Sequence, residues 1–279
     1  MEYKKLAGGG IGRRVTIFFM SKTKRLVIAN WKMNPQTPDE AKAILAGTRK
    51  ATESLKYTEV IVCPSFLYFP AAVKSITSKV RAKMRVGVQD IFWEDRGSFT
   101  GEVSAAMVKA GGGTHVIVGH SERRALGETD EMVGKKVAAV VREDLTAILC
   151  IGEGERDVNG NYLSFLKQQL SAGLSGVQKR HVGQIVVAYE PVWAIGKSER
   201  EALTGSGMHE MTIFIRKLLS DIYGRDIAVQ VPILYGGSVT PANAGDIVSE
   251  GHTDGLLVGR QSLDPAQFVE ILKIVDSIS

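Results

Sequence analysis

Eight short runs of aliphatic, mostly β-branched residues recur along this chain, and a glycine or a polar residue ends or follows each of them. They lie at 25–30, 59–64, 85–90, 115–120, 146–152, 185–190, 231–237 and 255–259. Most are apolar at successive positions instead of alternate ones, a pattern typical of parallel strands that are covered on both faces. The chain is therefore expected to form a parallel sheet with an apolar layer on each side.

Segments with helical spacing separate these runs, and several carry helix start signals. After the first run, Thr37 is predicted as an N-cap, Pro38 takes the first helical position, and acidic residues follow. Further helices are expected over 130–144, 161–174, 208–224, 240–251 and 264–277. Strands that begin at intervals of roughly 25–45 residues and alternate with helices favour an α/β fold, a single-domain (β/α)8 TIM barrel.

An open doubly wound sheet would show the same alternation and is the main alternative. No G-x-G-x-x-G motif follows the first run, and that motif is typical of open sheets that bind dinucleotides. The barrel is therefore favoured. No linker or change of composition follows residue 24, so we expect residues 25–279 to form one catalytic barrel. Residues 1–24 are expected to be a flexible basic extension outside it.

Composition limits the functional classes. Hydrophobic residues make up 44% of the chain and charged residues 23%, which is ordinary for a globular protein. No apolar stretch approaches the roughly 20 residues that span a bilayer, so no membrane segment is expected. Residues 1–24 carry six basic residues and one acidic residue, which accounts for the whole net charge of +5. Because the charge is confined to this segment and lacks interleaved aromatics, nucleic-acid binding is not expected.

The chain has two cysteines, Cys63 and Cys150, and both lie within apolar runs. They are expected to be small buried hydrophobic residues, with no disulfide framework and no metal site. This usage is typical of a reducing compartment, so we expect a cytoplasmic protein.

Polar residues and glycines stand where the predicted strands end. In a parallel barrel these ends meet on one rim, where barrel active sites lie. The rim is expected to collect a base, a hydrogen-bond donor, a cation and glycine-rich turns, contributed by Asn30, Lys32, Gln89, His120, Glu190, Gly236, Gly237, Ser238 and Gly259. Two glycine-rich turns ahead of helices are suited to bind phosphate through backbone N–H groups.

Each of these residues also has a structural interpretation. Glu190 could cap a helix or form a salt bridge at the rim, although Pro191 leads into a stretch with no immediate helix. Lys32 could be a solvated surface charge. His120 could be a structural hydrogen-bond donor, but Ser121 and Glu122 are expected to begin a helix whose dipole points at the ring and keeps it neutral.

Seven motifs stand in order across residues 25–279: ANWKMN (29–34), GSFTGEVS (97–104), VGHSERR (118–124), CIGE (150–153), AYEPVWAIG (188–196), YGGSV (235–239) and DGLLVG (254–259). Together they closely resemble the triosephosphate isomerase family. The resemblance implies an aldose–ketose isomerase of glycolysis and gluconeogenesis. Such an enzyme interconverts dihydroxyacetone phosphate and D-glyceraldehyde 3-phosphate through an enediolate, with no metal and no organic cofactor.

The resemblance also assigns roles to the rim residues. Glu190 matches the base that carries the proton, and His120 matches the neutral electrophile. Asn30 and Lys32 match residues that bind substrate and stabilise oxyanion charge, and Glu122 matches a residue that contacts the lysine. Residues 191–196 match a lid that keeps water from the enediolate. The phosphate-binding positions are matched by Gly196, Ser238, Gly259 and the amide of Arg260, and the latch of the closed lid by Tyr235 and Ser238.

The loop at 97–104 matches one that inserts into a partner subunit in this family. The resemblance therefore implies a twofold homodimer, with Phe99 and Thr100 at the tip of the loop.

Three features depart from the family pattern: the lid hinge at 197–207, Arg260 in place of a commoner glycine, and Asp90 in place of asparagine. The sequence assigns no role to Asp90. Two alternatives stay open, another phosphate-binding barrel enzyme of the aldolase type and a non-catalytic barrel that serves as a binding scaffold.

Overall fold

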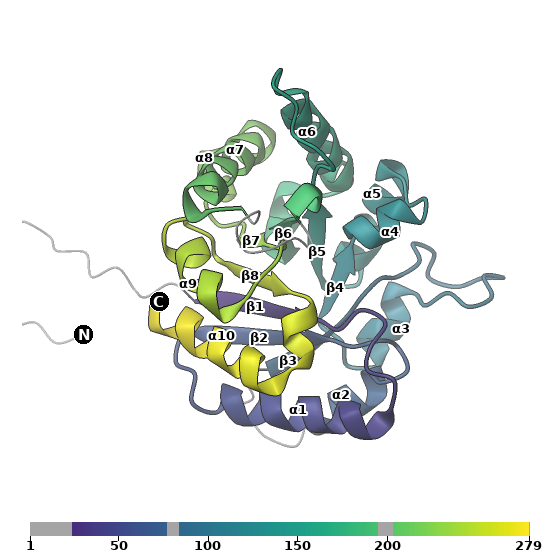
Figure 1. Ribbon diagram of the computed structural model, residues 1–279. Helices are drawn as coiled ribbons and strands as arrows, with labels where there is room; N and C mark the ends of the chain where they lie inside the picture. The colour runs from purple at the N-terminus through teal and green to yellow at the C-terminus, as the bar shows by residue number, and fades with distance from the viewer. Residues whose placement is uncertain (1–23, 77–83, 195–202, 279) are drawn as a thin grey trace, which may run out of the picture.

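The eight predicted strands form a closed barrel. A computed structural model of the chain describes residues 24–76, 84–194 and 203–278. Each strand pairs in parallel with the next, and the last pairs with the first (Figure 1). The strands are β1 (Arg25–Asn30), β2 (Thr58–Cys63), β3 (Met84–Val88), β4 (His115–Val118), β5 (Thr146–Ile151), β6 (Ile185–Tyr189), β7 (Ile233–Tyr235) and β8 (Gly255–Val258). The predicted (β/α)8 barrel is confirmed, and the alternative of an open doubly wound sheet is wrong.

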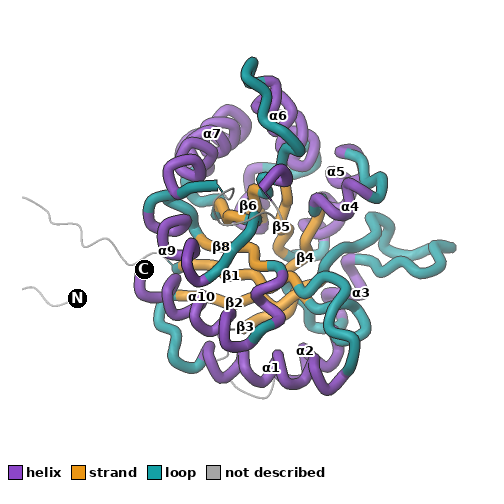
Figure 2. The backbone as a smooth tube through the Cα atoms, in the orientation of Figure 1, coloured by secondary structure: helices purple, strands orange, loops and turns teal. Residues whose placement is uncertain are grey.

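Helices surround the barrel and cover the outer face of the sheet (Figure 2). The longer ones are α1 (Pro38–Thr52), α5 (Asp130–Arg142), α6 (Asn161–Leu174), α7 (Gly205–Tyr223), α9 (Pro241–Ser249) and α10 (Pro265–Ile278). The shorter ones are α2 (Phe69–Ile76), α3 (Ala105–Ala110), α4 (Ser121–Ala125) and α8 (Arg225–Ala228), with 3-10 turns η1 (Lys179–Gln184), η2 (Val192–Ala194) and η4 (Arg260–Leu263).

Helix boundaries follow the local capping chemistry. Thr37 caps α1 as predicted, because its side chain accepts a hydrogen bond from the Glu40 N–H. Helix α7 begins three residues earlier than the predicted start at 208. The cause is Thr204, whose hydroxyl accepts a hydrogen bond from the Gly207 N–H at 3.2 Å and so sets the first turn further upstream.

The apolar residues form two layers, as the unbroken apolar strands predicted. One layer fills the barrel interior and consists of Ile28, Ile61, Cys63, Ile117, Ile148, Cys150, Val186, Ala188, Leu234 and Leu257. The other lies between the strands and the helices and includes Val27, Val60, Val187 and Phe268. Both cysteines are buried free thiols. Of the described helices, none combines the length and apolar character required to cross a membrane.

The strand ends set the positions of the polar residues. β4 stops at Val118 and β6 at Tyr189, slightly before their predicted ends, so His120 and Glu190 stand just outside the sheet. Ile151 of β5 pairs with Tyr189, and Tyr189 pairs with Tyr235 of β7. In this register the neighbouring parallel strands end at the same height along the barrel. The residues that follow them therefore meet on one rim.

Candidate active site

A cavity of about 400 Å³ opens at the carboxyl ends of the strands. It collects most of the residues that the sequence placed at the rim: Asn30, Lys32, His120, Glu122, Glu190, Gly236, Gly237, Ser238, Gly259 and Arg260. Three residues predicted for the rim or the site are not among its lining, namely Gln89, Tyr235 and Gly196. Tyr235 is buried, and Gly196 lies outside the described residues, together with residues 197–202 of the predicted hinge. The cavity is therefore built from the ends of five strands, β1, β4, β6, β7 and β8.

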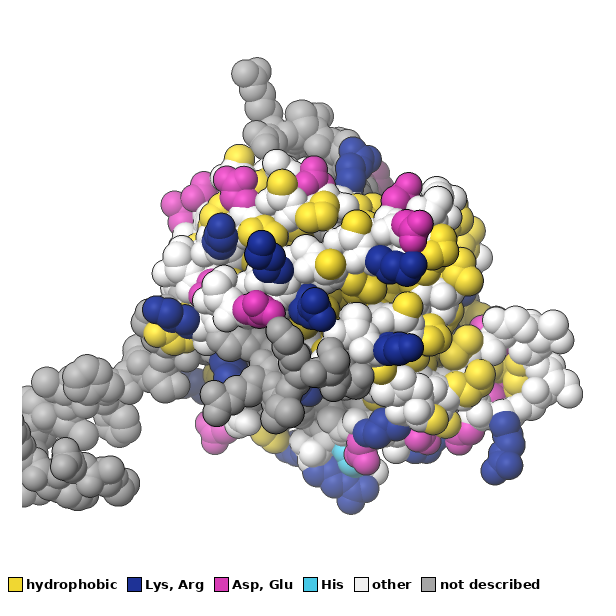
Figure 3. All heavy atoms as spheres, turned by 90° about the horizontal axis from the view of Figure 1, so that it is seen from below, with side chains coloured by type: hydrophobic (Ala, Val, Ile, Leu, Met, Phe, Trp, Pro, Cys, Tyr) yellow, Lys and Arg dark blue, Asp and Glu magenta, His cyan; other side chains and the backbone are white. Residues whose placement is uncertain are grey.

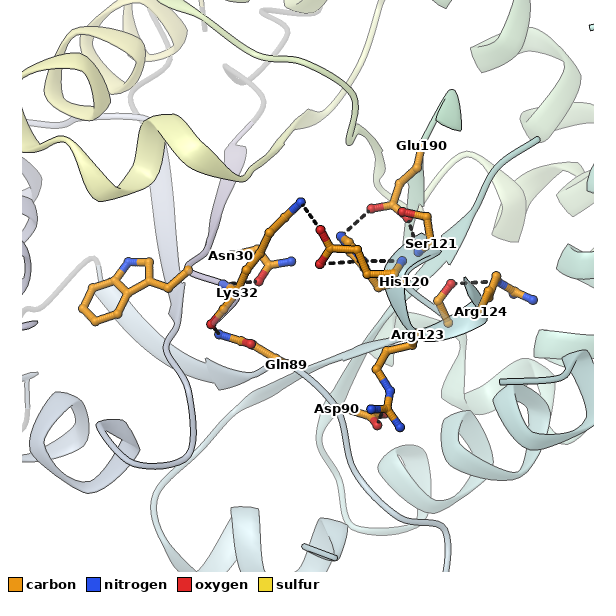
Figure 4. A network of polar contacts seen from close by, with 12 residues as sticks. Asn30, Lys32, Gln89, Asp90, His120, Ser121, Arg123, Arg124 and Glu190 are labelled. Carbon is orange, nitrogen blue, oxygen red and sulfur yellow. Dashed lines mark hydrogen bonds and ion pairs between the residues drawn. The ribbon is translucent and has the colours of Figure 1, made fainter. Parts of the chain in front are cut away.

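Glu190 lines this cavity and is only 1% exposed. Its backbone N–H donates to the Ile151 carbonyl at 2.8 Å, which continues the sheet pairing by one residue. Oε2 accepts a hydrogen bond from the Ser121 N–H at 2.9 Å, and Oε1 lies 3.0 Å from Nε2 of His120 (Figure 4). Among the described residues, none donates a well-aligned hydrogen bond to Oε1. One oxygen of the carboxylate is thus anchored, and the other remains an available acceptor.

Gly236 makes room for that carboxylate. A Cβ atom at this position would lie 2.9 Å from Cγ of Glu190, which is closer than carbon atoms approach without displacement. The glycine after β7 is therefore required by packing against Glu190, in addition to any contact with a ligand.

His120 is the N-cap of α4. Its Nδ1 accepts a hydrogen bond from the Glu122 N–H at 3.1 Å, so in this geometry Nδ1 carries a lone pair and no proton. The proton of the neutral ring must then be on Nε2, the nitrogen that faces Glu190. The helix predicted to begin at Ser121 is confirmed, and its first turn selects the tautomer.

The charge state of His120 reflects two opposing effects. Burial of the ring lowers the pKa of His120, whereas the Glu190 carboxylate against Nε2 raises it, and the net shift is upward. The Glu122 N–H at Nδ1 favours the neutral ring, because an imidazolium would present a second N–H there. The neutral imidazole expected from the sequence therefore stays a prediction.

Lys32 reaches the cavity from an unusual backbone conformation. Its φ of 54° lies in the left-handed region, which costs a non-glycine residue free energy. Two side chains hold it there: Oδ1 of Asn30 accepts the Lys32 N–H at 3.0 Å, and Nε2 of Gln89 donates to the Lys32 carbonyl at 2.9 Å. Its Nζ forms an ion pair with Oε1 of Glu122 at 2.7 Å. The predicted contact between Glu122 and the lysine is present.

The glycine-rich turns border the other side of the cavity. Gly259 lies beside Lys32, and η4 begins at Arg260 immediately after β8. Oγ of Ser238 donates to the Ala194 carbonyl at 3.2 Å, which ties the turn after β7 to the first part of the predicted lid. Tyr235 lies beneath Gly237, and burial raises the pKa of its phenol to about 12. Among the described residues, no group of three His, Cys, Asp or Glu side chains is placed to hold a metal ion.

Two functional contacts were not predicted from the sequence. The Ser121 N–H holds Glu190 across 69 positions of sequence, and its only sequence signal is its place as the first residue of a helix. Glu153 is buried, and its Oε1 accepts hydrogen bonds from the Tyr189 hydroxyl at 2.7 Å and from Nε1 of Trp193 at 2.9 Å. It thereby fixes the start of the predicted lid, although CIGE was noted only as a motif.

Comparison with known proteins agrees with this geometry. A family model described as triosephosphate isomerase matches residues 25–275. The triosephosphate isomerase of Moorella thermoacetica is 40% identical over 250 residues, 88% of this chain and 97% of that protein. Those of Roseiflexus castenholzii and Endomicrobium trichonymphae are 40% and 38% identical, over 88% and 90% of this chain and 96% and 98% of the respective proteins. The chain belongs to the triosephosphate isomerase family.

Membership of the triosephosphate isomerase family defines the reaction. The protein is an intramolecular aldose–ketose isomerase that interconverts triose phosphates. The alternatives of an aldolase-type enzyme and of a non-catalytic scaffold are thereby decided against. The match also covers every described residue that lines the cavity, since all of them lie between residues 25 and 275.

Proposed function

We propose that Glu190 is the base of this isomerase and His120 its neutral electrophile. The observation that carries the proposal is the pair itself, with Oε1 of Glu190 and Nε2 of His120 3.0 Å apart at the cavity. The Ser121 N–H orients the carboxylate through its other oxygen, and the Glu122 N–H orients the imidazole through its other nitrogen. A base and a hydrogen-bond donor held in this way can act on adjacent atoms of one small substrate.

The reaction then follows from these positions. The Glu190 carboxylate removes a proton from C1 of dihydroxyacetone phosphate, and the C–H electron pair forms the C1–C2 double bond of the enediolate. Negative charge develops on the former carbonyl oxygen, where the Nε2–H of His120 donates a hydrogen bond and stabilises it. Glu190 then returns the proton to C2, which takes up the electron pair of the double bond. The proton of the C1 hydroxyl is transferred to the C2 oxygen, so that C1 becomes the aldehyde and D-glyceraldehyde 3-phosphate results.

Lys32 and Asn30 are proposed to bind the substrate and to stabilise the oxyanion. Asn30 uses Oδ1 to hold the Lys32 N–H, so its side-chain NH₂ group is the part proposed to donate to a substrate oxygen. The Lys32 ammonium is paired with Glu122 at 2.7 Å on the border of the cavity. An anionic substrate would compete for this ammonium and would gain a charge-assisted contact.

The phosphate group is proposed to lie against the turns after β7 and β8. Backbone N–H groups at Gly259 and Arg260, with Ser238 opposite, would bind its oxygens in the manner of helix-start anion sites. Gly196 and the rest of the lid at 191–196 are proposed to close over the enediolate, with Tyr235 and Ser238 as the latch. The hydrogen bond from Ser238 to the Ala194 carbonyl supports contact between this turn and the lid.

A homodimer through the loop at 97–104 is also proposed. Exposed hydrophobic side chains occur on this loop and on several other described segments: Met33, Phe66, Leu67, Phe99, Met107 and Leu126. Hydrophobic side chains gather beside the projecting loop in Figure 3. Burying these side chains against a second copy would be favourable, and the proposed partner loop would reach the segment that carries Lys32.

Two further proposals concern the setting of the enzyme. Residues 1–24 are proposed to lie outside the catalytic barrel, since the family match and β1 both begin at Arg25. Removal of residues 1–19 should leave turnover and melting temperature unchanged. A melting temperature lower by several degrees would show that these residues dock on the barrel.

A cytoplasmic location is proposed from the two free buried thiols, and cell fractionation tests it.

Glu190→Gln tests the assignment of the base. It keeps the shape of the side chain but cannot accept the proton, so turnover of glyceraldehyde 3-phosphate in a coupled assay should fall by about 10³-fold or more. The matched control is Glu131→Gln, at an exposed ion pair with Lys135 in the first turn of α5, which should keep full activity. Circular dichroism should be unchanged in both. A near-normal rate for Glu190→Gln would refute the assignment.

A further inference from the structure

Four charged side chains meet where the loop after β3 contacts α4 and α5. Lys136 of α5 is buried, and its Nζ contacts both oxygens of Asp90 at 2.7 and 2.8 Å and Oε1 of Glu128. Nε of Arg123, on α4, lies 3.0 Å from Oδ2 of Asp90. Two carboxylates and two cations therefore balance one another, and Asp90 is the member that contacts both cations.

Asp90 adjoins Gln89, and the two side chains reach in different directions (Figure 4). Gln89 donates to the carbonyls of Lys32 and Cys63 at 2.9 and 3.0 Å, which holds the end of β2 and the segment after β1. Asp90 contacts α4 through Arg123 and α5 through Lys136. Two consecutive residues of one loop thus connect the Lys32 segment to the helix that follows His120.

Helix α4 depends on such polar contacts for its position. It has five residues, and none of them is buried, so apolar packing does little to hold it in place. Its ion pairs with other described elements are Glu122 with Lys32 at 2.7 Å, Arg123 with Asp90 at 3.0 Å and Arg124 with Asp130 at 2.6 Å. Its first turn supplies the N–H groups of Ser121 and Glu122 that orient Glu190 and His120. A shift of α4 would therefore move both members of the proposed catalytic pair.

We propose that Asp90 is a positioning residue for the isomerisation, which holds α4, and with it the Ser121 and Glu122 N–H groups, in register with Glu190 and His120. The proposal rests on the roles proposed for those two side chains. Asp90 contacts no substrate in this scheme. Its effect passes through Arg123 and Lys136. In this chain the negative charge matters because one carboxylate serves two cations at once, where the family pattern has a neutral asparagine.

Asp90→Asn tests the proposal, since it keeps the shape and removes the charge. We expect kcat to fall by about 10-fold with KM changed less than about twofold, because misplacement of catalytic groups by a fraction of an ångström slows the chemical step. The matched control is Asp95→Asn in the same loop, where a half-exposed carboxylate pairs with Arg142 at 2.6 Å. That variant should keep the wild-type kcat.

Two further measurements separate positioning from a general loss of structure. The ¹⁵N signal of His120 Nδ1 should shift in Asp90→Asn and not in Asp95→Asn. In the first variant the Glu122 N–H group, which donates a hydrogen bond to this nitrogen, is expected to move. The fold-loss of kcat in the double variant Asp90→Asn/Arg123→Gln should be smaller than the product of the two separate fold-losses, since both substitutions act through one contact. Sedimentation of each variant at assay concentration should match the wild type.

Several results would overturn the proposal: a kcat for Asp90→Asn within twofold of wild type, an unshifted His120 signal, fully multiplicative losses with Arg123→Gln, or a loss of activity that follows subunit dissociation. Glu190→Gln measured in parallel distinguishes the two levels of inference. If Glu190→Gln retains activity, the proposed roles of Glu190 and His120 fail. If Glu190→Gln is inactive and Asp90→Asn is normal, the positioning role alone fails.

Discussion

At the scale of single residues, the Glu190 carboxylate acts on the protonation of His120. Their polar atoms lie 3.0 Å apart, and both side chains are buried. In such surroundings a neighbouring charge is screened little, so the carboxylate changes the pKa of the imidazole. For His120 the carboxylate acts against burial and the net pKa shift is upward.

Glu190→Gln should therefore lower the pKa of His120. Replacing the carboxylate by a neutral amide removes the charge that favours imidazolium, while burial continues to favour the neutral ring. The measurement is an NMR titration of the imidazole ¹⁵N signals of both proteins between about pH 4 and pH 9. An unchanged or higher pKa in the variant would show that Glu190 does not control the charge of the ring.

At the scale of elements, β4 carries a histidine that the reaction does not use. His115 is the first residue of the strand and is 7% exposed, with Nδ1 2.7 Å from Oγ1 of Thr114. Burial, and then the positive charge of Arg85, lower its pKa to about 4. The ring is therefore neutral in the folded barrel at pH values where it is charged in the unfolded chain.

This difference predicts acid-sensitive stability. Between pH 6.5 and about 4 the unfolded chain binds a proton at His115 that the folded chain does not, so the free energy of unfolding falls as the pH falls through this window. The full effect is about 3 kcal/mol. His115→Gln should remove this part of the pH dependence, whatever its effect at pH 8, as measured by urea unfolding from pH 8 to pH 4. Equal slopes for the two proteins would contradict the prediction.

The sequence predicted the longer elements better than the contacts between them. Strands such as β1 and helices such as α6 have strong local signals, namely unbroken apolar runs and helical spacing. The short helices α2 and α3 were not predicted, because six to eight residues show little periodicity. His120 and Glu190 could be placed from strand ends alone. The contact of Lys136 with Asp90 could not, because it joins residues 46 positions apart and depends on which side chains become buried.

At the scale of the whole molecule, the exposed Phe99 and the hydrophobic side chains beside the projecting loop in Figure 3 predict the assembly. Phe99→Asp places a charge at a position that is 43% exposed here and would be buried in the proposed dimer. We expect sedimentation velocity to show monomers, with activity lower by at least about 10-fold because the Lys32 segment loses support from the partner.

The control for this prediction is Val158→Asp. Val158 is fully exposed, and it lies in the loop before α6, distant in sequence from the proposed interface. This variant should stay dimeric and active. A fully active Phe99→Asp monomer would show that each subunit works alone.

The pairing of β8 with β1 has a consequence for the newly made chain. Leu26 pairs with Gly255 and Ala29 with Val258, so the ring is completed only by residues within the last 25 of the 279. During synthesis, which runs from the N-terminus, the strands already made keep two open edges, and such edges invite pairing with other chains. The enzyme can therefore form only after β8 has been made, and a messenger truncated before β8 yields an aggregation-prone fragment instead of a weaker catalyst.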